Sequence, residues 1–304
     1  MKLVSCSEAG RVFAGWWREA RVLDLAAAGR HINEAADLGS MLAIIRGGDG
    51  ARAALQRIAS RSEEFADVWL DAGRLQFLAP IPVPIRNVFC VGRNYVDHVK
   101  EGYARAGKEA RLPEVPQFFT KATGAVNSPD GEVRLDPRLT RLLDYEVELA
   151  VVIGRGGRDI DATRAHEHVF GYTVANDFTA RDLQRRHEQW FKGKSLDTTC
   201  PLGPCIVERA EIADPARLEL SLSVNGEERQ RAHAAQMIFD IPTIIAALSA
   251  GLTLEPGDII LTGTPAGVGY AMDPPQALRD GDLVVSRIEG IGELRNRIVA
   301  VRRA

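Results

Sequence analysis

The sequence of 304 residues has no uninterrupted apolar run of the roughly 18 residues that a membrane-spanning helix needs. Its first ten residues, MKLVSCSEAG, also lack the apolar core of a signal peptide. A formal net charge of -3 gives no excess of positive charge that would attract nucleic acid or an anionic membrane. We therefore expect a cytoplasmic protein that binds neither of these partners.

Cysteine is scarce, and the four cysteines show no Cys-x-x-Cys spacing that would indicate a zinc site. All four lie in apolar surroundings, as reduced and buried thiols do. No internal repeat or low-complexity tract is present, and a content of 45% hydrophobic and 26% charged residues is that of an ordinary globular protein. The sequence thus predicts free thiols at Cys6, Cys90, Cys200 and Cys205.

Prolines at 80, 82 and 84 mark residues 79–85 as an extended connector, because proline fits neither a helix interior nor a central strand. We expect a small α+β module over residues 1–78 and a larger domain over residues 86–304. In the module, strands are predicted near residue 3 and at 12–17 and 21–25, and helices at 36–46, 51–60 and 62–70.

The larger domain is predicted to be α+β and mainly β, because short apolar runs follow one another with few helical patterns between them. This pattern favours a mixed or antiparallel sheet over a doubly wound parallel one. Strands are expected at 86–91, 133–135, 145–153, 169–176, 203–207, 218–224, 258–262 and 283–288, and helices at 180–190 and 241–249.

Two glutamates, Glu146 and Glu148, interrupt the most apolar of these strands. Successive side chains of a strand point to opposite faces, so both carboxylates lie on one face. Two like charges in a partly dry site repel, which raises one pKa or favours a hard cation such as Mg²⁺ or Mn²⁺. The alternative for a lone Glu-x-Glu is a solvated strand face.

A third carboxylate, Asp177, follows the strand predicted at 169–176 and precedes a predicted helix. It could cap that helix, but Thr179 and Asp182 form a near capping box that would leave Asp177 free to turn toward the sheet. Glu146, Glu148 and Asp177 are then a plausible oxygen-ligand set for Mg²⁺.

His98 and Glu101 are three residues apart, so on a helix they share one face, where the carboxylate can orient the imidazole as a general base. An incidental pair on a surface helix is the alternative. The polar stretch that follows suggests a mobile lid.

Two further loops carry candidate groups. Lys194 could neutralise a substrate carboxylate or a developing enolate, although exposed lysines are usually only solvated. The glycine-rich segment 261–269 offers backbone N–H groups for an oxyanion, but it lacks the Gly-Lys-Ser/Thr ending of a phosphate-binding loop, so nucleotide binding is not expected. A purely structural tight turn is the alternative.

Taken together, the motifs resemble the fumarylacetoacetate hydrolase family. The similar segments occur in family order: NVFCVGRNYVDH (87–98), FFTK (118–121), DYEVELA (144–150), GYTVANDFTARDLQ (171–184), GKSLDTTCPLGP (193–204) and IILTGTPAGVG (259–269). The resemblance implies a mixed β-sheet roll with few helices and a homodimer. It also implies a Mg²⁺ or Mn²⁺ ion at Glu146, Glu148 and Asp177, with His98 and Glu101 as the water-activating pair on a lid and Lys194 as an enolate-stabilising group. The positions implied around a bound oxo acid are Arg93, Lys121, Arg181, Gln184 and Thr264.

The function that the resemblance implies is metal-dependent hydrolysis of a carbon–carbon bond in a 2,4-dioxo acid of the acylpyruvate or fumarylpyruvate type, as in aromatic compound catabolism. His98 would take a proton from the water that attacks the C4 carbonyl, and a metal-stabilised enolate would leave. The alternatives are decarboxylation of oxaloacetate and isomerisation of 2-hydroxyhepta-2,4-diene-1,7-dioate. A non-catalytic oxo-acid binding protein is a further alternative, against which the His98 and Glu101 pair argues.

Overall fold

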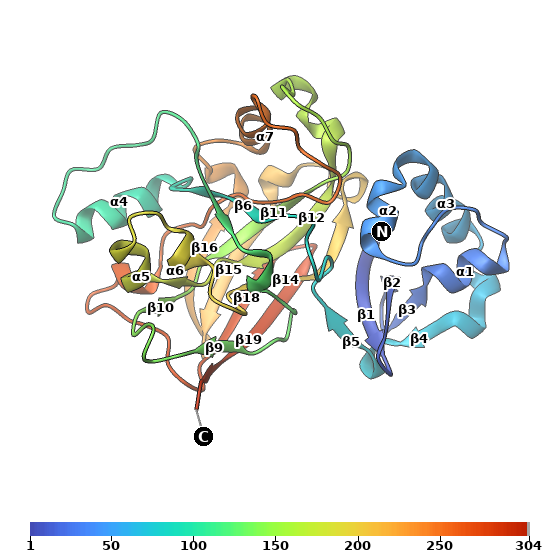
Figure 1. The fold of residues 1–304 in the computed structure, drawn as a ribbon, viewed down its shortest axis with the longest axis horizontal. Helices are drawn as coiled ribbons and strands as arrows, with labels where there is room; N and C mark the ends of the chain where they lie inside the picture. The colour runs from blue at the N-terminus through green and yellow to red at the C-terminus, as the bar shows by residue number, and fades with distance from the viewer. Residues whose placement is uncertain (303–304) are drawn as a thin grey trace.

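The computed structural model describes residues 1–302, and its N-terminal part is a small sheet covered by helices (blue in Figure 1). The predicted strands are present, but the helix predicted over 36–46 begins only at Met41, and residues 62–68 form a 3-10 helix in place of an α-helix. The elements are β1 (Lys2–Glu8), β2 (Arg11–Arg18), β3 (Arg21–Asp24), α1 (Leu25–His31), α2 (Met41–Arg46), α3 (Gly48–Ser60), β4 (Trp69–Asp71) and β5 (Gln76–Leu78). Helix α1 and strands β4 and β5 were not predicted.

The rest of the chain is mainly β, as predicted. Its strands are β6 (Val88–Gly92), β7 (Gln117–Lys121), β8 (Val126–Asn127), β9 (Val133–Leu135), β10 (Leu143–Asp144), β11 (Val147–Ile153), β12 (Val169–Asn176), β13 (Thr179–Ala180), β14 (Cys200–Glu208), β15 (Glu219–Val224), β16 (Glu227–His233), β17 (Ile259–Leu261), β18 (Leu283–Ile288) and β19 (Gly292–Ala300). Its helices are α4 (Val96–Arg105), α5 (Arg181–Arg186), α6 (Phe191–Lys194) and α7 (Ile241–Ser249).

One mixed sheet runs through both parts of the molecule in the order β4-β3-β2-β1-β14-β12-β11-β17-β6-β7. The junction is the antiparallel pairing of β1 with β14, in which Leu3 lies opposite Ile206. A second sheet, β16-β15-β18-β19-β9, packs against the body (Figure 1). The N-terminal residues thus extend the central sheet, and the division at 79–85 stays a prediction.

Strand β11 shows why the site lies where it does. Val147, Leu149 and Val151 are buried in the core that includes β15 and β18 of the second sheet, whereas Ala150 and Val152 belong to the core on the opposite face. Glu148 shares its face with Ala150, as the alternation predicts. Burial on both faces makes β11 a rigid base for that side chain.

The four cysteines are free and buried, which agrees with the prediction. None of the helices between residues 1 and 302 combines the length and apolar character that a membrane crossing needs.

The helix predicted over 180–190 was too long. Helix α5 ends at Arg186, and Glu188 adopts a φ of 55°, a backbone conformation that stops a right-handed helix. The capping prediction was also wrong, because Ala180 precedes the helix and Thr179 donates its hydroxyl proton to the Asp177 carbonyl. The chain therefore turns between α5 and α6, and this turn brings Lys194 back toward β11.

Candidate active site

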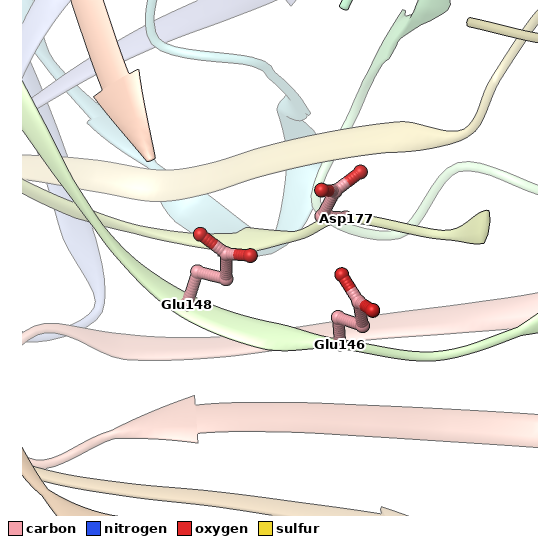
Figure 2. A group of neighbouring side chains, drawn as sticks. All are labelled: Glu146, Glu148 and Asp177. Carbon is pink, nitrogen blue, oxygen red and sulfur yellow. The ribbon is translucent and has the colours of Figure 1, made fainter. Parts of the chain in front are cut away.

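Glu146, Glu148 and Asp177, here called the carboxylate trio, converge as the sequence predicts (Figure 2). Each offers a carboxylate oxygen, and these oxygens lie within 4.8 Å of one another. Glu146 directly precedes β11, Glu148 lies within it, and Asp177 directly follows β12, which pairs with β11 through Val147 and Asn176. All three are buried, at 4%, 2% and 0% exposure, which excludes the solvated strand face.

Three buried cations surround the trio. The Lys194 Nζ atom lies 2.6 Å from both a Glu146 oxygen and an Asp177 oxygen. Arg181 contacts the other Glu146 oxygen at 2.7 Å, and the Lys121 Nζ atom contacts the other Asp177 oxygen at 2.7 Å. Glu148 has no cationic partner within residues 1–302, and its Oε2 atom accepts a hydrogen bond from the Gly263 N–H group at 2.6 Å.

The unequal pairing separates the pKa values of the two glutamates. Burial acts to raise the pKa of Glu146, but the charges of Lys194 and Arg181 outweigh it and lower that pKa to about 2. Burial and the negative charges of Asp177 and Glu146 raise the pKa of Glu148 well above its usual value. Negative charge at Glu148 is therefore uncompensated in the protein alone.

The trio fits a divalent cation. Its donors are all carboxylate oxygens, the set that Mg²⁺ and Mn²⁺ prefer over softer metals. Counting Asp144, which pairs with Arg181, four buried carboxylates face three buried cations and leave one negative charge. A bound divalent cation would reverse the sign of that balance and favour an anionic substrate.

The predicted base lies on α4, with its orienting carboxylate. His98 Nδ1 and Glu101 Oε1 are 2.7 Å apart, and Glu101 Oε2 accepts a hydrogen bond from the Gly267 N–H group at 2.9 Å. Because an ionised carboxylate only accepts, the imidazole proton is on Nδ1 and the Nε2 lone pair is free. His98 lines the same cavity as Glu146 and Glu148.

The glycine-rich segment 261–269 binds anions, but they are the carboxylates of the protein itself. Its N–H groups at Gly263, Gly267 and Gly269 donate to Glu148, Glu101 and Asp144. The expectation that this segment offers those groups to a substrate oxyanion was wrong. Through these hydrogen bonds the segment links Glu148 of the trio to Glu101 on α4, the helix that carries His98.

The cavity has a volume of about 730 Å³. Eight of the predicted site residues line it, whereas Lys121, Asp177 and Glu101 do not. The predicted lining residues are Arg93, His98, Glu146, Glu148, Arg181, Gln184, Lys194 and Thr264. The part of each in binding substrate stays a prediction. Arg93 has a φ of 56°, a conformation uncommon for residues other than glycine, and lies against the rings of Tyr103 and Trp190.

Sequence reasoning missed several lining residues, among them Arg105, Phe119, Arg185, Trp190 and Tyr270. It also missed the buried Asp144, whose carboxylate accepts hydrogen bonds from Arg181 Nε and from the Gly269 and Tyr270 N–H groups, at 2.9, 2.8 and 3.1 Å. Asp144 is the first residue of the DYEVELA motif, and its position two residues before Glu146 was the only sequence feature that could have indicated a role in the site. This residue ties Arg181 to the glycine-rich segment.

Replacing Asp144 with asparagine should destabilise the protein by about 2–4 kcal/mol, because an amide cannot accept all of these hydrogen bonds and leaves the Arg181 charge poorly paired. Urea unfolding measures the change in the free energy of unfolding. Asp97→Asn is the matched control, since Asp97 is an exposed partner of Lys100 and its loss should cost less than about 1 kcal/mol. Equal stability of the two variants would show that Asp144 does not organise the site.

Comparison with known proteins places the chain in a family. The family model described as fumarylacetoacetate (FAA) hydrolase C-terminal matches residues 87–299. The chain belongs to the fumarylacetoacetate hydrolase family. The family match thereby confirms the resemblance inferred from the motifs, and the chain is an enzyme of this family.

Relatives within the family differ in activity. The chain is 43% identical to the oxaloacetate tautomerase YisK of Bacillus subtilis, over 98% of this chain and all of the relative. Its fold is similar to that of a fumarylacetoacetate hydrolase from Exiguobacterium antarcticum, with a TM-score of 0.81 and 40% identity over 99% of this chain and 100% of the other. A maleylpyruvate hydrolase from Sphingobium sp. SYK-6, solved with manganese(II) and pyruvate, has a TM-score of 0.77 and 28% identity over the same shares of the two chains.

Proposed function

We propose that this protein is a Mg²⁺- or Mn²⁺-dependent oxaloacetate tautomerase, which interconverts the keto and enol forms. The observation that carries the proposal is the oriented His98 imidazole, which shares a cavity with the Glu146 and Glu148 carboxylates. Tautomerisation needs one base, one site that polarises the 2-oxo group and no attacking water. Similarity to the Bacillus subtilis tautomerase along the whole chain supports this choice.

In the proposed reaction, His98 Nε2 takes a proton from C3 of the keto acid, and the electrons of that C–H bond form the C2–C3 double bond. Negative charge develops on the 2-oxo oxygen, which becomes the enol hydroxyl by taking a proton from solvent, while His98 releases the C3 proton to solvent, so that no net proton is gained or lost. A divalent cation held by Glu146, Glu148 and Asp177 would acidify the C3 protons by withdrawing electrons from the 2-oxo group. Lys194 contributes fixed positive charge beside the trio, because Asp177 and Glu146 outweigh burial and raise its pKa.

Hydrolysis of an acylpyruvate, the activity first expected from the motifs, is the second candidate. The similarity to maleylpyruvate hydrolase favours it, as does a cavity larger than a four-carbon acid requires. His98 would then take its proton from water in place of C3. Decarboxylation of oxaloacetate and isomerisation of 2-hydroxyhepta-2,4-diene-1,7-dioate would use the same carboxylate trio.

A substrate panel tests the proposal. Chelated protein reloaded with Mg²⁺ or Mn²⁺ is given oxaloacetate, an acylpyruvate, fumarylpyruvate and 2-hydroxyhepta-2,4-diene-1,7-dioate. We expect keto–enol exchange of oxaloacetate to be at least a thousandfold faster than in buffer and to stop when EDTA is added, because metal polarisation and a general base together supply several kcal/mol. Pyruvate release from oxaloacetate is followed in parallel to detect decarboxylation. Rapid cleavage of the acylpyruvate without accelerated exchange of oxaloacetate would make the protein a hydrolase.

The assembly remains a proposal carried over from the family resemblance. We propose a homodimer, which light scattering coupled to size-exclusion chromatography distinguishes from a monomer of 33.2 kDa.

A further inference from the structure

Part of the active-site cavity is lined by positively charged side chains that form no ion pair within residues 1–302. These are Arg93 after β6, Arg105 at the end of α4, Lys108 in the following loop and Arg185 on α5. The ion pairs of α4 and α5 are made by His98, Lys100 and Arg181. Besides the trio members Glu146 and Glu148, the one carboxylate on the cavity wall within this part of the chain is Glu188, so positive charge is in excess.

Arg105, Arg185 and Tyr270 line the same two cavities. The smaller, adjoining one has a volume of about 190 Å³ and is also lined by Arg181. The guanidinium carbon of Arg185 lies 5.5 Å from the centre of the Tyr270 ring, and that of Arg181 lies 4.5 Å from the same centre. Two segments distant in the sequence, α4 and α5, thus contribute arginines to the lining of the same cavities.

A buried donor at the same place lacks an acceptor. Arg181 is 4% exposed and uses its Nε and Nη1 atoms on Asp144 and Glu146, but its Nη2 atom has no hydrogen-bond partner among the described residues. Buried donors are nearly always satisfied, so this one indicates a missing acceptor. A carboxylate is the acceptor that guanidinium groups bind best.

We propose that Arg105 and Arg185 bind the second carboxylate of a dicarboxylic 2-oxo acid, so that the cavity selects dicarboxylates over monocarboxylates of the same length. The inference rests on the proposed function, in which the carboxylate trio takes the 2-oxo acid end. Along α4, His98, Glu101 and Arg105 follow the i, i+3, i+7 spacing of one helix face. A carboxylate held by Arg105 thereby also fixes the helix that carries the base.

The test is calorimetric binding of unreactive 2-oxo acids to the Mg²⁺-loaded protein. The probes are 2-oxoglutarate and 2-oxoadipate, each compared with the monocarboxylate of the same chain length, 2-oxopentanoate and 2-oxohexanoate. For the wild type we expect at least one of the dicarboxylates to bind about ten- to a hundredfold more tightly than its monocarboxylate counterpart. Arg105→Gln and Arg185→Gln should each reduce this ratio toward one while leaving the monocarboxylate Kd unchanged.

Arg186→Gln is the matched control. Arg186 is the exposed neighbour of Arg185 on α5, carries the same charge and lines neither cavity, so its loss should leave the ratio unchanged. Equal binding of both acid classes to the wild type would overturn the inference, as would an equal loss of preference in Arg186→Gln. If the protein prefers dicarboxylates but does not convert oxaloacetate, the inference stands and the proposed function is rejected. If it converts oxaloacetate without preferring dicarboxylates, the proposed function stands and the inference is rejected.

Discussion

Replacing Glu148 with glutamine is expected to reduce metal-dependent turnover about a thousandfold or more without destabilising the metal-free protein. The trio loses one of its three carboxylates, and the polarisation that a divalent cation supplies is worth several kcal/mol. Stability should not fall, because Glu148 is the member whose pKa is raised by burial and by Asp177 and Glu146. Glutamine removes that repulsion and retains an oxygen that can accept from the Gly263 N–H group.

Glu146→Gln is the control that separates metal binding from stability. Glu146 pairs with Arg181 at 2.7 Å and with Lys194 at 2.6 Å, so its neutral replacement leaves two buried cations without this partner. We expect it to lose turnover as well and to lower the free energy of unfolding by about 3–5 kcal/mol. Calorimetric titration with Mn²⁺ and urea unfolding in EDTA measure the two effects. Wild-type metal affinity in Glu148→Gln would show that the trio is not the metal site.

Replacing His98 with asparagine is expected to lower kcat about a hundred- to ten-thousandfold, the usual contribution of a general base. Metal affinity should not change, because His98 pairs with Glu101 and none of the trio ligands depends on its hydrogen bond. Turnover of oxaloacetate and Mn²⁺ titration of the same preparation give the two values. Unchanged turnover would remove His98 from the mechanism.

Replacing Glu101 with glutamine tests whether this carboxylate acts by orienting His98. The carboxylate accepts from both His98 Nδ1 and the Gly267 N–H group, and a glutamine side chain, with one acceptor oxygen and one donor NH₂ group, can satisfy only one of these donors. We expect a loss of turnover smaller than that of His98→Asn, with metal affinity retained. A larger loss than that of His98→Asn would show that Glu101 does more than orient the imidazole.

The pairs Glu146–Glu148 and His98–Glu101 could be predicted from the sequence because local rules govern them, whereas the place of Asp177 beside the two glutamates depends on the pairing of β11 with β12. Alternation along the strand predicted over 145–153 put Glu146 and Glu148 together, and helical spacing paired His98 with Glu101. The neighbourhood of Arg105, Arg185 and Tyr270 had no comparable signal, because its members come from α4, α5 and a loop near residue 270 and meet only through the tertiary fold. Strand β16 was missed because its residues are mostly polar, with only Gln230 and Ala232 buried.

The role of the glycine-rich segment was predicted only in part. Its N–H groups suggested an anion site, but the sequence could not show that Glu101, Asp144 and Glu148 would occupy them. Similarly, the lysine in GKSLDTTCPLGP was recognised as Lys194, but not its ion pairs with Glu146 and Asp177. Both depend on the turn between α5 and α6 and on contacts between residues distant in the chain.

One short helix carries both members of the His98–Glu101 pair and one of the two arginines proposed to bind the second carboxylate. Helix α4 carries His98, the carboxylate that orients it and Arg105, whereas the carboxylate trio lies within or directly next to strands β11 and β12 of the central sheet. Its closest link to the glycine-rich segment is the hydrogen bond from the Gly267 N–H group to Glu101. If the proposals hold, the proton-transfer pair and part of the substrate-binding surface belong to one ten-residue helix, separate from the strands beside the carboxylate trio. Substitutions within α4 should then change substrate preference while the geometry of the trio stays the same.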